Sequence, residues 1–229
     1  MITTTRQTRH SLAIAILFFF TMSEMYAQQV IEGIHYHTGQ PVQVTISNGL
    51  IQNIVNVNKP VGENPIYIAP GFFDNQVNGF AGVSFAFGES DLTPEGIEKA
   101  TRELWKKGVT TYLPTLTTNS IDVLTQNFRI LSKAVDDKNL LGSIPGFHLE
   151  GPYINPEDGY RGAHPKQFVQ LPDWNNFMKL HEASGRNILQ VTLAPEMEGA
   201  LDFISKCSLE GIVVALGHQD RKSTRLNSS

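Results

Sequence analysis

Residues 146–152 read Gly146-Phe147-His148-Leu149-Glu150-Gly151-Pro152, an apolar run that ends in a carboxylate and a Gly-Pro turn. The wider apolar segment, residues 143–149, has the length and composition of a buried strand. His148 and Glu150 are two residues apart, so on a strand their side chains project from the same face. A carboxylate at the end of a buried strand needs a partner, because an isolated buried charge is costly. The stretch therefore predicts a buried strand whose carboxyl end carries a polar site.

Similar apolar runs lie on both sides of this strand, and segments with helical periodicity separate them. The runs are continuous rather than alternating, which is typical of parallel strands covered on both faces. They give about five predicted strands, at residues 68–77, 109–113, 143–149, 188–193 and 211–216. This α/β pattern fits either a doubly wound sheet or the beginning of a barrel, and periodicity does not decide between them. No Gly-rich phosphate loop follows any of these strands, which disfavours a nucleotide-binding sheet.

Capping residues mark the helices between these strands. Thr93 is a predicted N-cap followed by Pro94 at the first helical position, and Gly108 ends that helix. Ser120 is a predicted N-cap for the second helix. A third helix is expected over residues 172–182, and a fourth carries Cys207 on its apolar side.

A small β module is predicted before the α/β part. Val42, Val44 and Ile46 alternate with polar residues, and Asn48-Gly49 is a strong hairpin signal. We therefore expect a small antiparallel β domain over residues 28–69, followed by the first part of the α/β domain over residues 70–220.

The first 27 residues resemble an export signal. Arg6 and Arg9 precede an apolar stretch at residues 12–22, and Ala27 supplies a small residue before a cleavage point. The apolar stretch is short for a membrane span. We expect export to the cell envelope, in a Gram-negative cell the periplasm, and no stable membrane span once the signal is removed. The alternative is a start codon set too early and a cytoplasmic protein.

The last nine residues, 221–229, are polar and without periodicity. They directly follow a strand that is expected to be buried. We interpret them as a non-native or disordered tail, and the chain as C-terminally truncated.

Composition excludes several classes of function. The 229 residues are 41% hydrophobic and 17% charged, which is enough apolar material for a sizeable core. A net charge of −4 provides no basic surface for nucleic acid. The single cysteine, Cys207, excludes an internal disulfide and any cysteine-rich metal site.

Polar side chains follow the predicted strands, where parallel α/β folds place their chemistry. Gln76 and Asn78 follow the first strand, His148 and Glu150 end the third, and His218 follows the fifth. A carboxylate and a neutral imidazole that converge from different strands suit a divalent metal such as Zn²⁺. His218 by itself is more often a structural histidine, and His148 fits a metal ligand and a supporting group equally well.

Several of these segments together resemble the N-acetylglucosamine-6-phosphate deacetylases of the amidohydrolase superfamily. The resemblance covers roughly residues 30–220, and the paired His-Leu-Glu-Gly-Pro and Gly-Ala-His-Pro segments are its most specific part. The matching segments are residues 70–79, 146–152, 162–165, 194–196 and 217–218. The resemblance implies a (β/α)₈ TIM-type barrel joined to a small β domain. This chain would hold about five of the eight strands.

The resemblance also implies roles for particular residues. Glu150 and His218 match metal ligands, and Ala163 and His164 match residues that line the substrate site. Many superfamily members carry His-x-His after the first strand for a second metal. Gln76-Val77-Asn78 stands there in this chain, which implies a single divalent ion, with Zn²⁺ expected and Fe²⁺ as an alternative. Gln76, Asn78 and His148 would then support the metal site.

The implied reaction is deacetylation of an N-acetylated amino sugar, most closely N-acetylglucosamine 6-phosphate, to acetate and glucosamine 6-phosphate. Metal-activated water would attack the acetyl carbonyl, and an acid/base would protonate the leaving amine. The family's third metal ligand and its acid/base aspartate have no match in this sequence. We therefore expect this chain to be inactive, and the full-length parent to be an active homodimer with a small-molecule substrate.

Two other functions remain open from the sequence. The chain fits another amidohydrolase that acts on a different amide or cyclic amide. It also fits a catalytically dead sugar-binding protein, which would bind no stoichiometric metal.

Overall fold

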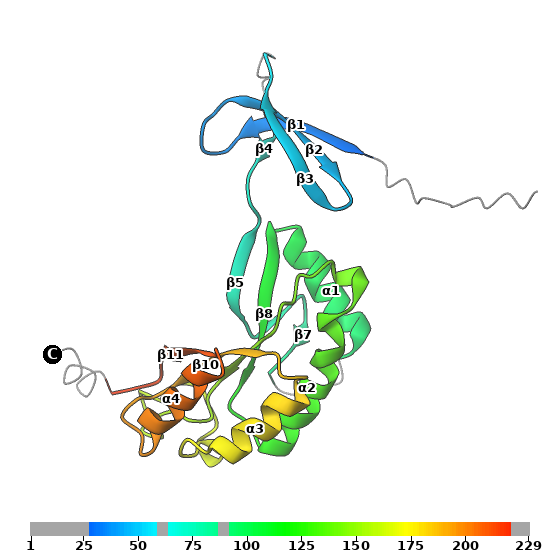
Figure 1. Cartoon of the computed structure of the whole chain (residues 1–229). Helices are drawn as coiled ribbons and strands as arrows, with labels where there is room; N and C mark the ends of the chain where they lie inside the picture. The colour runs from blue at the N-terminus through cyan, green and yellow to red at the C-terminus, as the bar shows by residue number, and fades with distance from the viewer. Residues whose placement is uncertain (1–27, 59–63, 87–91, 221–229) are drawn as a thin grey trace, which may run out of the picture. The chain divides into compact units, whose positions relative to one another are not determined.

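The computed structural model describes residues 28–58, 64–86 and 92–220. The predicted export signal and the predicted C-terminal tail lie outside these ranges. The described part of the chain divides into two compact units, with the boundary between Ala69 and Pro70. Each unit has its own sheet (Figure 1).

The first unit is a small four-stranded sheet with the order β3-β2-β1-β4. Its strands are β1 (Gln29–His35), β2 (Pro41–Ser47), β3 (Leu50–Asn56) and β4 (Tyr67–Ile68). β1, β2 and β3 pair antiparallel, as predicted, and β4 adds a parallel edge to β1. The hairpin between β2 and β3 turns at Asn48 and Gly49, which both have the positive φ that this tight turn requires.

The second unit is built on five parallel strands with the order β11-β10-β9-β8-β5. These strands are β5 (Phe72–Val77), β8 (Val109–Thr117), β9 (Phe147–Glu150), β10 (Ile188–Leu193) and β11 (Val213–Leu216). Each strand pairs with the next one along the chain, whereas a doubly wound sheet reverses its order. The structure therefore confirms a partial barrel of five strands and excludes the doubly wound alternative.

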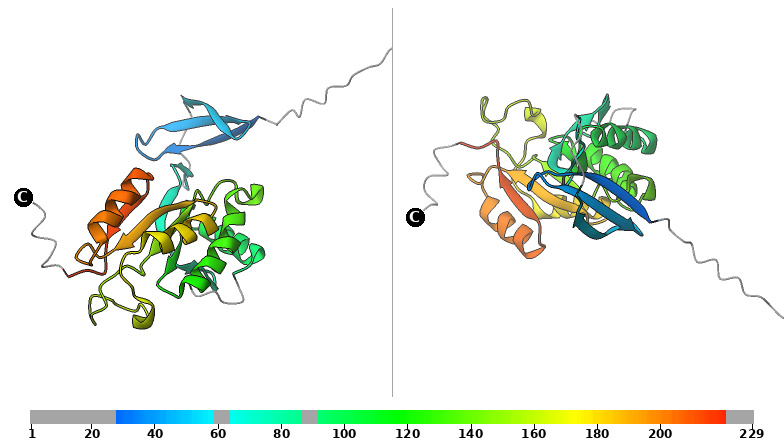
Figure 2. Two further views of the ribbon diagram at one scale, coloured as in Figure 1. Left: turned by 60° about the horizontal axis from the view of Figure 1, so that its bottom comes forward. Right: turned by 90° about the horizontal axis from the view of Figure 1, so that it is seen from above.

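The helices between the strands are those that the sequence predicts. They are α1 (Pro94–Trp105), α2 (Ile121–Val135), α3 (Trp174–Ala183) and α4 (Ala200–Leu209), with short 3₁₀ turns at Lys138–Leu140 and Lys166–Phe168. A minor hairpin, β6 (Gly79–Phe80) with β7 (Val83–Ser84), follows β5. Thr93 and Ser120 cap α1 and α2 through their hydroxyl oxygens, as expected. α2 packs against α1 and against α3 (Figure 2). None of the helices in the described ranges is long and apolar enough to cross a membrane.

Several strand boundaries differ from the predictions. β8 continues to Thr117 rather than ending at Leu113, and β11 begins at Val213 rather than at Gly211. Ile68 belongs to β4 of the first unit, so the first barrel strand begins only at Phe72. β9 begins at Phe147 rather than at Ser143. The Ser143 carbonyl accepts a hydrogen bond from the Tyr112 backbone N–H of β8, but Pro145 has no N–H with which to continue the pairing.

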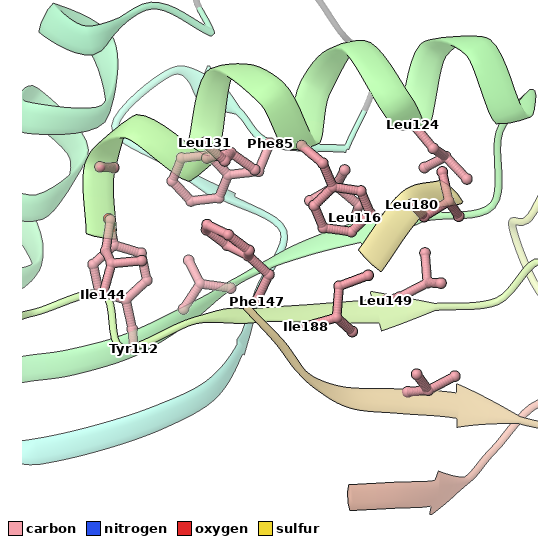
Figure 3. Packing of buried hydrophobic residues seen from close by; sticks show 14 of the residues in the cluster. Phe85, Tyr112, Leu116, Leu124, Leu131, Ile144, Phe147, Leu149, Leu180 and Ile188 are labelled. Carbon is pink, nitrogen blue, oxygen red and sulfur yellow. The ribbon is translucent and has the colours of Figure 1, made fainter. Parts of the chain in front are cut away.

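The main core lies between the helices and one face of the parallel sheet. Phe147 and Leu149 of β9 are fully buried there, together with Leu116 of β8 and with Leu124 and Leu131 of α2. Figure 3 shows these side chains between α2 and the strands. Because side chains alternate along a strand, the same packing turns His148 and Glu150 to the opposite face of the sheet.

Replacement of Phe147 by alanine tests this core. The ring is fully buried and packs at 5.8 Å between centroids against Phe128. We expect Phe147→Ala to lower the free energy of unfolding by about 3–5 kcal/mol, as large-to-small core substitutions do. Phe72→Ala is the matched control, because Phe72 is exposed, and we expect it to cost no more than about 0.5 kcal/mol. Denaturant unfolding followed by circular dichroism measures the free energy of unfolding of both variants. Equal losses in the two variants would contradict the placement of Phe147 in the core.

Cys207 gives a second test of packing. The thiol is fully buried on α4, and burial raises its pKa to about 12. A raised pKa leaves little thiolate at neutral pH, and thiolate is the reactive form. We expect a disulfide reagent at pH 8 to modify Cys207 much faster in denaturant than in the folded chain. Similar rates in the two states would show that Cys207 is accessible.

Candidate metal centre

Three side chains meet at the carboxyl ends of the parallel strands. Glu150 ends β9, His164 lies in the loop after β9, and His218 follows β11. Their ligand atoms all lie within 4.8 Å of one another, and they form the only such group of three among the described residues. His218 Nε2 lies 3.1 Å from Glu150 Oε1 and 3.2 Å from His164 Nε2. His164 Nε2 lies 4.0 Å from Glu150 Oε1.

The Glu150 carboxylate is buried but fully partnered. Oε1 faces His218, and Oε2 accepts a hydrogen bond of 3.3 Å from the side-chain amide of Asn78, which follows β5. Burial raises the pKa of Glu150, but the hydrogen bonds from His218 and Asn78, together with the charges of His164 and His218, bring the pKa down to about 2. Glu150 is therefore charged at neutral pH, and its negative charge attracts a cation.

His218 is held from its far side. Its Nδ1–H donates to the backbone carbonyl of Tyr160 at 3.1 Å, so Nε2 is the nitrogen that faces Glu150. The hydrogen bond with Glu150, partly opposed by burial, raises the pKa of His218. A Cβ added at Gly162 would lie 3.4 Å from the imidazole ring, so the loop backbone packs directly against it.

His164 is oriented by a hydroxyl group. Its Nδ1 lies 2.7 Å from Thr118 Oγ1, just after β8, and this contact turns Nε2 toward His218. Burial, together with the charge of His218, lowers the pKa of His164, which favours its neutral form. Gly151 makes room for this arrangement: it has φ +77°, and a Cβ there would lie 2.2 Å from Thr118 Oγ1.

His148 lies outside the cluster. Its Nδ1–H donates to the Asn75 carbonyl at 3.1 Å, and its Nε2 lies 2.8 Å from the Thr192 hydroxyl. Burial lowers the pKa of His148, so the ring is neutral and Nε2 accepts from Thr192. Because both nitrogens are engaged, the structure places His148 as a link between β5, β9 and β10 rather than at the meeting point of the three ligand atoms.

Asn78, Gln76 and Ala163 are the other residues singled out from the sequence. Asn78 hydrogen-bonds directly to Glu150. Gln76 is exposed, and the described side chains that hydrogen-bond to Glu150 are Asn78 and His218. Ala163 is exposed beside His164.

Sequence reasoning assigned no role to Thr118 or Tyr160. Thr118 directly follows β8, and no local pattern in the sequence indicates that its hydroxyl contacts an imidazole from the loop after β9. Tyr160 acts through its backbone carbonyl, for which the sequence carries no signal.

The donor set fits a divalent metal. One carboxylate and two imidazoles are the protein ligands of a common type of catalytic zinc site, which leaves further positions for water or substrate. The second nitrogen of each histidine is already hydrogen-bonded, as is usual for histidines that bind a metal. The two Nε2 atoms face each other at 3.2 Å, and a shared cation satisfies both of them together with Glu150.

Comparison with known proteins identifies relatives of this chain. No protein-family model matches the chain. The chain is 37% identical over 159 residues to an N-acetylglucosamine-6-phosphate deacetylase of Danio rerio, which covers 68% of the chain and 38% of that protein. It is 31% identical over 208 residues to the enzyme of that name from Vibrio furnissii, which covers 85% of the chain and 48% of that protein.

Solved structures show the same similarity. The N-acetyl-D-glucosamine-6-phosphate deacetylase of Mycobacterium smegmatis, a D267A mutant in complex with N-acetyl-D-glucosamine-6-phosphate, matches with a TM-score of 0.71 and 25% identity, over 84% of this chain and 50% of that one. The Pasteurella multocida deacetylase matches with a TM-score of 0.63 and 26% identity, over 78% and 46% of the two chains. The chain thus spans half or less of the length of the relatives it matches. Over that length it is a homologue of the N-acetylglucosamine-6-phosphate deacetylases.

Proposed function

We propose that this chain carries part of the catalytic centre of a metal-dependent deacetylase of N-acetylated amino sugars. The observation that supports this most is the Glu150, His164 and His218 cluster at the carboxyl ends of the barrel strands. The likeness to deacetylases, one of them solved with N-acetyl-D-glucosamine-6-phosphate, makes that sugar phosphate the first substrate to test.

Glu150 and His218 would hold the metal ion, as the resemblance implies. In this chain His164 completes the set, because its Nε2 faces the same point and its Nδ1 is fixed by Thr118. This assignment differs from the expectation that His164 lines the substrate site. The residues around the cluster keep the donors available, since Asn78 engages only Oε2 of Glu150 and leaves Oε1 toward the histidines.

A divalent metal bound there would supply Lewis-acid polarisation of the acetyl carbonyl and activation of water. The overall reaction breaks the C–N bond of the amide: hydroxide from water joins the acetyl carbon and a proton joins the amine. The products are acetate and the free amino sugar. The proton transfer to nitrogen requires an acid/base. Among the described residues, the cluster of Glu150, His164 and His218 contains one carboxylate, that of Glu150. Because Glu150 is charged and would bind the metal, it would not carry out the proton transfer.

Zinc binding tests the metal site. We expect the purified chain to bind about one Zn²⁺, and Glu150→Gln to abolish stoichiometric binding because it removes the only charged ligand. If His164 is the third ligand, His164→Gln is expected to weaken zinc binding at least about tenfold. Unchanged zinc affinity would instead support the expectation that His164 lines the substrate site. Elemental analysis after dialysis, with a chelator competition for affinity, makes the measurement.

Glu157→Gln is the matched control for this experiment. Glu157 is exposed, lies seven positions after Glu150, and carries the same charge. It should retain the metal. Absence of stoichiometric zinc from the unsubstituted chain would reject the metal site and favour a non-catalytic sugar-binding protein.

Acetate release tests the reaction itself. We expect the metal-loaded 229-residue chain to release no acetate from N-acetylglucosamine 6-phosphate above the no-enzyme background. The reason is that Glu150 is the one carboxylate in the metal-ligand group of the described residues, and it would be held by the metal. An enzyme-coupled acetate assay, with N-acetylglucosamine as a parallel substrate, makes the measurement. Metal-dependent turnover that Glu150→Gln abolishes would contradict this expectation and show that the chain contains its own acid/base.

A further inference from the structure

His218 has an unusual backbone conformation. Its φ is +51°, in the left-handed region that residues other than glycine rarely adopt. Such a conformation persists only where neighbouring groups hold it. The segment is anchored on its N-terminal side, where Gly217 donates its backbone N–H to the Leu193 carbonyl at 3.0 Å.

On the C-terminal side, the segment is anchored by Glu196, which follows β10. Oε1 of Glu196 accepts a hydrogen bond of 2.7 Å from the backbone N–H of Asp220. The same oxygen accepts a hydrogen bond of 2.9 Å from the side-chain amide of Asn155. The backbone N–H of Asn155, in turn, donates to the His218 carbonyl at 3.0 Å. Glu196, Asn155, His218 and Asp220 therefore form a closed ring of contacts around the His218 backbone.

This ring joins the ends of three neighbouring strands. Asn155 lies in the loop after β9, Glu196 follows β10, and His218 and Asp220 follow β11. Glu196 itself is not a member of the metal-ligand group. One oxygen of Glu196 therefore accepts hydrogen bonds from two different segments, the loop after β9 and the segment after β11.

We propose that Glu196 is a positioning residue that, with Asn155, fixes the His218 backbone so that the imidazole stays against Glu150. The proposal rests on the metal site proposed above, since the position of His218 matters most for its role as a ligand. Glu196 would act through His218 and would not touch the metal. Groups that orient metal ligands typically change metal affinity 10- to 100-fold when they are removed.

The first experiment measures zinc affinity by competition with a chromophoric chelator. Glu196→Ala should weaken zinc binding about 10- to 100-fold while the chain stays folded. Glu196→Gln keeps an oxygen acceptor at the same place and should bind zinc nearly as well as the unsubstituted chain. Glu198→Ala is the matched control, because Glu198 is exposed two positions away and removes the same charge.

Three outcomes would overturn the proposal. Unchanged zinc affinity in Glu196→Ala would show that His218 needs no such support. Equal losses in Glu196→Ala and Glu198→Ala would indicate a general effect of charge. Equal losses in Glu196→Ala and Glu196→Gln would show that charge, rather than a hydrogen-bond acceptor, is what matters.

A second measurement is independent of the metal. Hydrogen exchange of the Asp220 amide, followed by NMR in the metal-free chain, should be faster in Glu196→Ala than in the unsubstituted chain. Unchanged exchange would reject the ring of contacts whatever the zinc result. Faster exchange in a chain that never binds zinc would support the ring and reject the proposed metal site, so the two failures are distinguishable.

Discussion

The charge of Glu150 is the constraint on which the site depends. A carboxylate buried at the end of a barrel strand is tolerated only with partners, and its partners come from distant parts of the chain. Asn78 approaches from the end of β5 and His218 from the end of β11, and both hydrogen-bond to the carboxylate. Burial raises the pKa of Glu150, but these hydrogen bonds, together with the charges of His164 and His218, lower it to about 2. A centre with a fixed negative charge and two converging imidazoles results.

The fold supplies this convergence through two simple geometric rules. Alternation along β9 puts Phe147 and Leu149 into the core and turns His148 and Glu150 to the other face. Parallel pairing in sequence order brings the carboxyl ends of all five strands to one edge, so the loops that follow them meet there. His148 then ties three strands together through the Asn75 carbonyl and the Thr192 hydroxyl. On this face of the sheet, His148 thus stabilises the strands, and Glu150 at the carboxyl end of β9 belongs to the candidate metal centre.

Much of this was predictable because it depends on local patterns. The hairpin at Asn48 and Gly49, the caps at Thr93 and Ser120, and the apolar strands follow from residue types at fixed spacings. The errors lie where non-local pairing decides: Ile68 joined the sheet of the first unit, and Pro145 delayed the start of β9. A strand boundary depends on which neighbour is available to accept and donate hydrogen bonds, and an apolar run does not encode that neighbour.

The sequence by itself determined the α/β alternation, the strand-end position of Glu150 and His218, and the similarity to deacetylases. Only the tertiary structure decided that the sheet is part of a barrel. It also decided that both ring nitrogens of His148 make internal hydrogen bonds and that His164 lies beside His218 in the cluster. It also revealed the ties from Thr118 to His164 and from Glu196 to the His218 segment. The physical reason is the same in each case. These contacts join residues 24 to 73 positions apart, and their geometry is set by packed strands and loops rather than by local sequence.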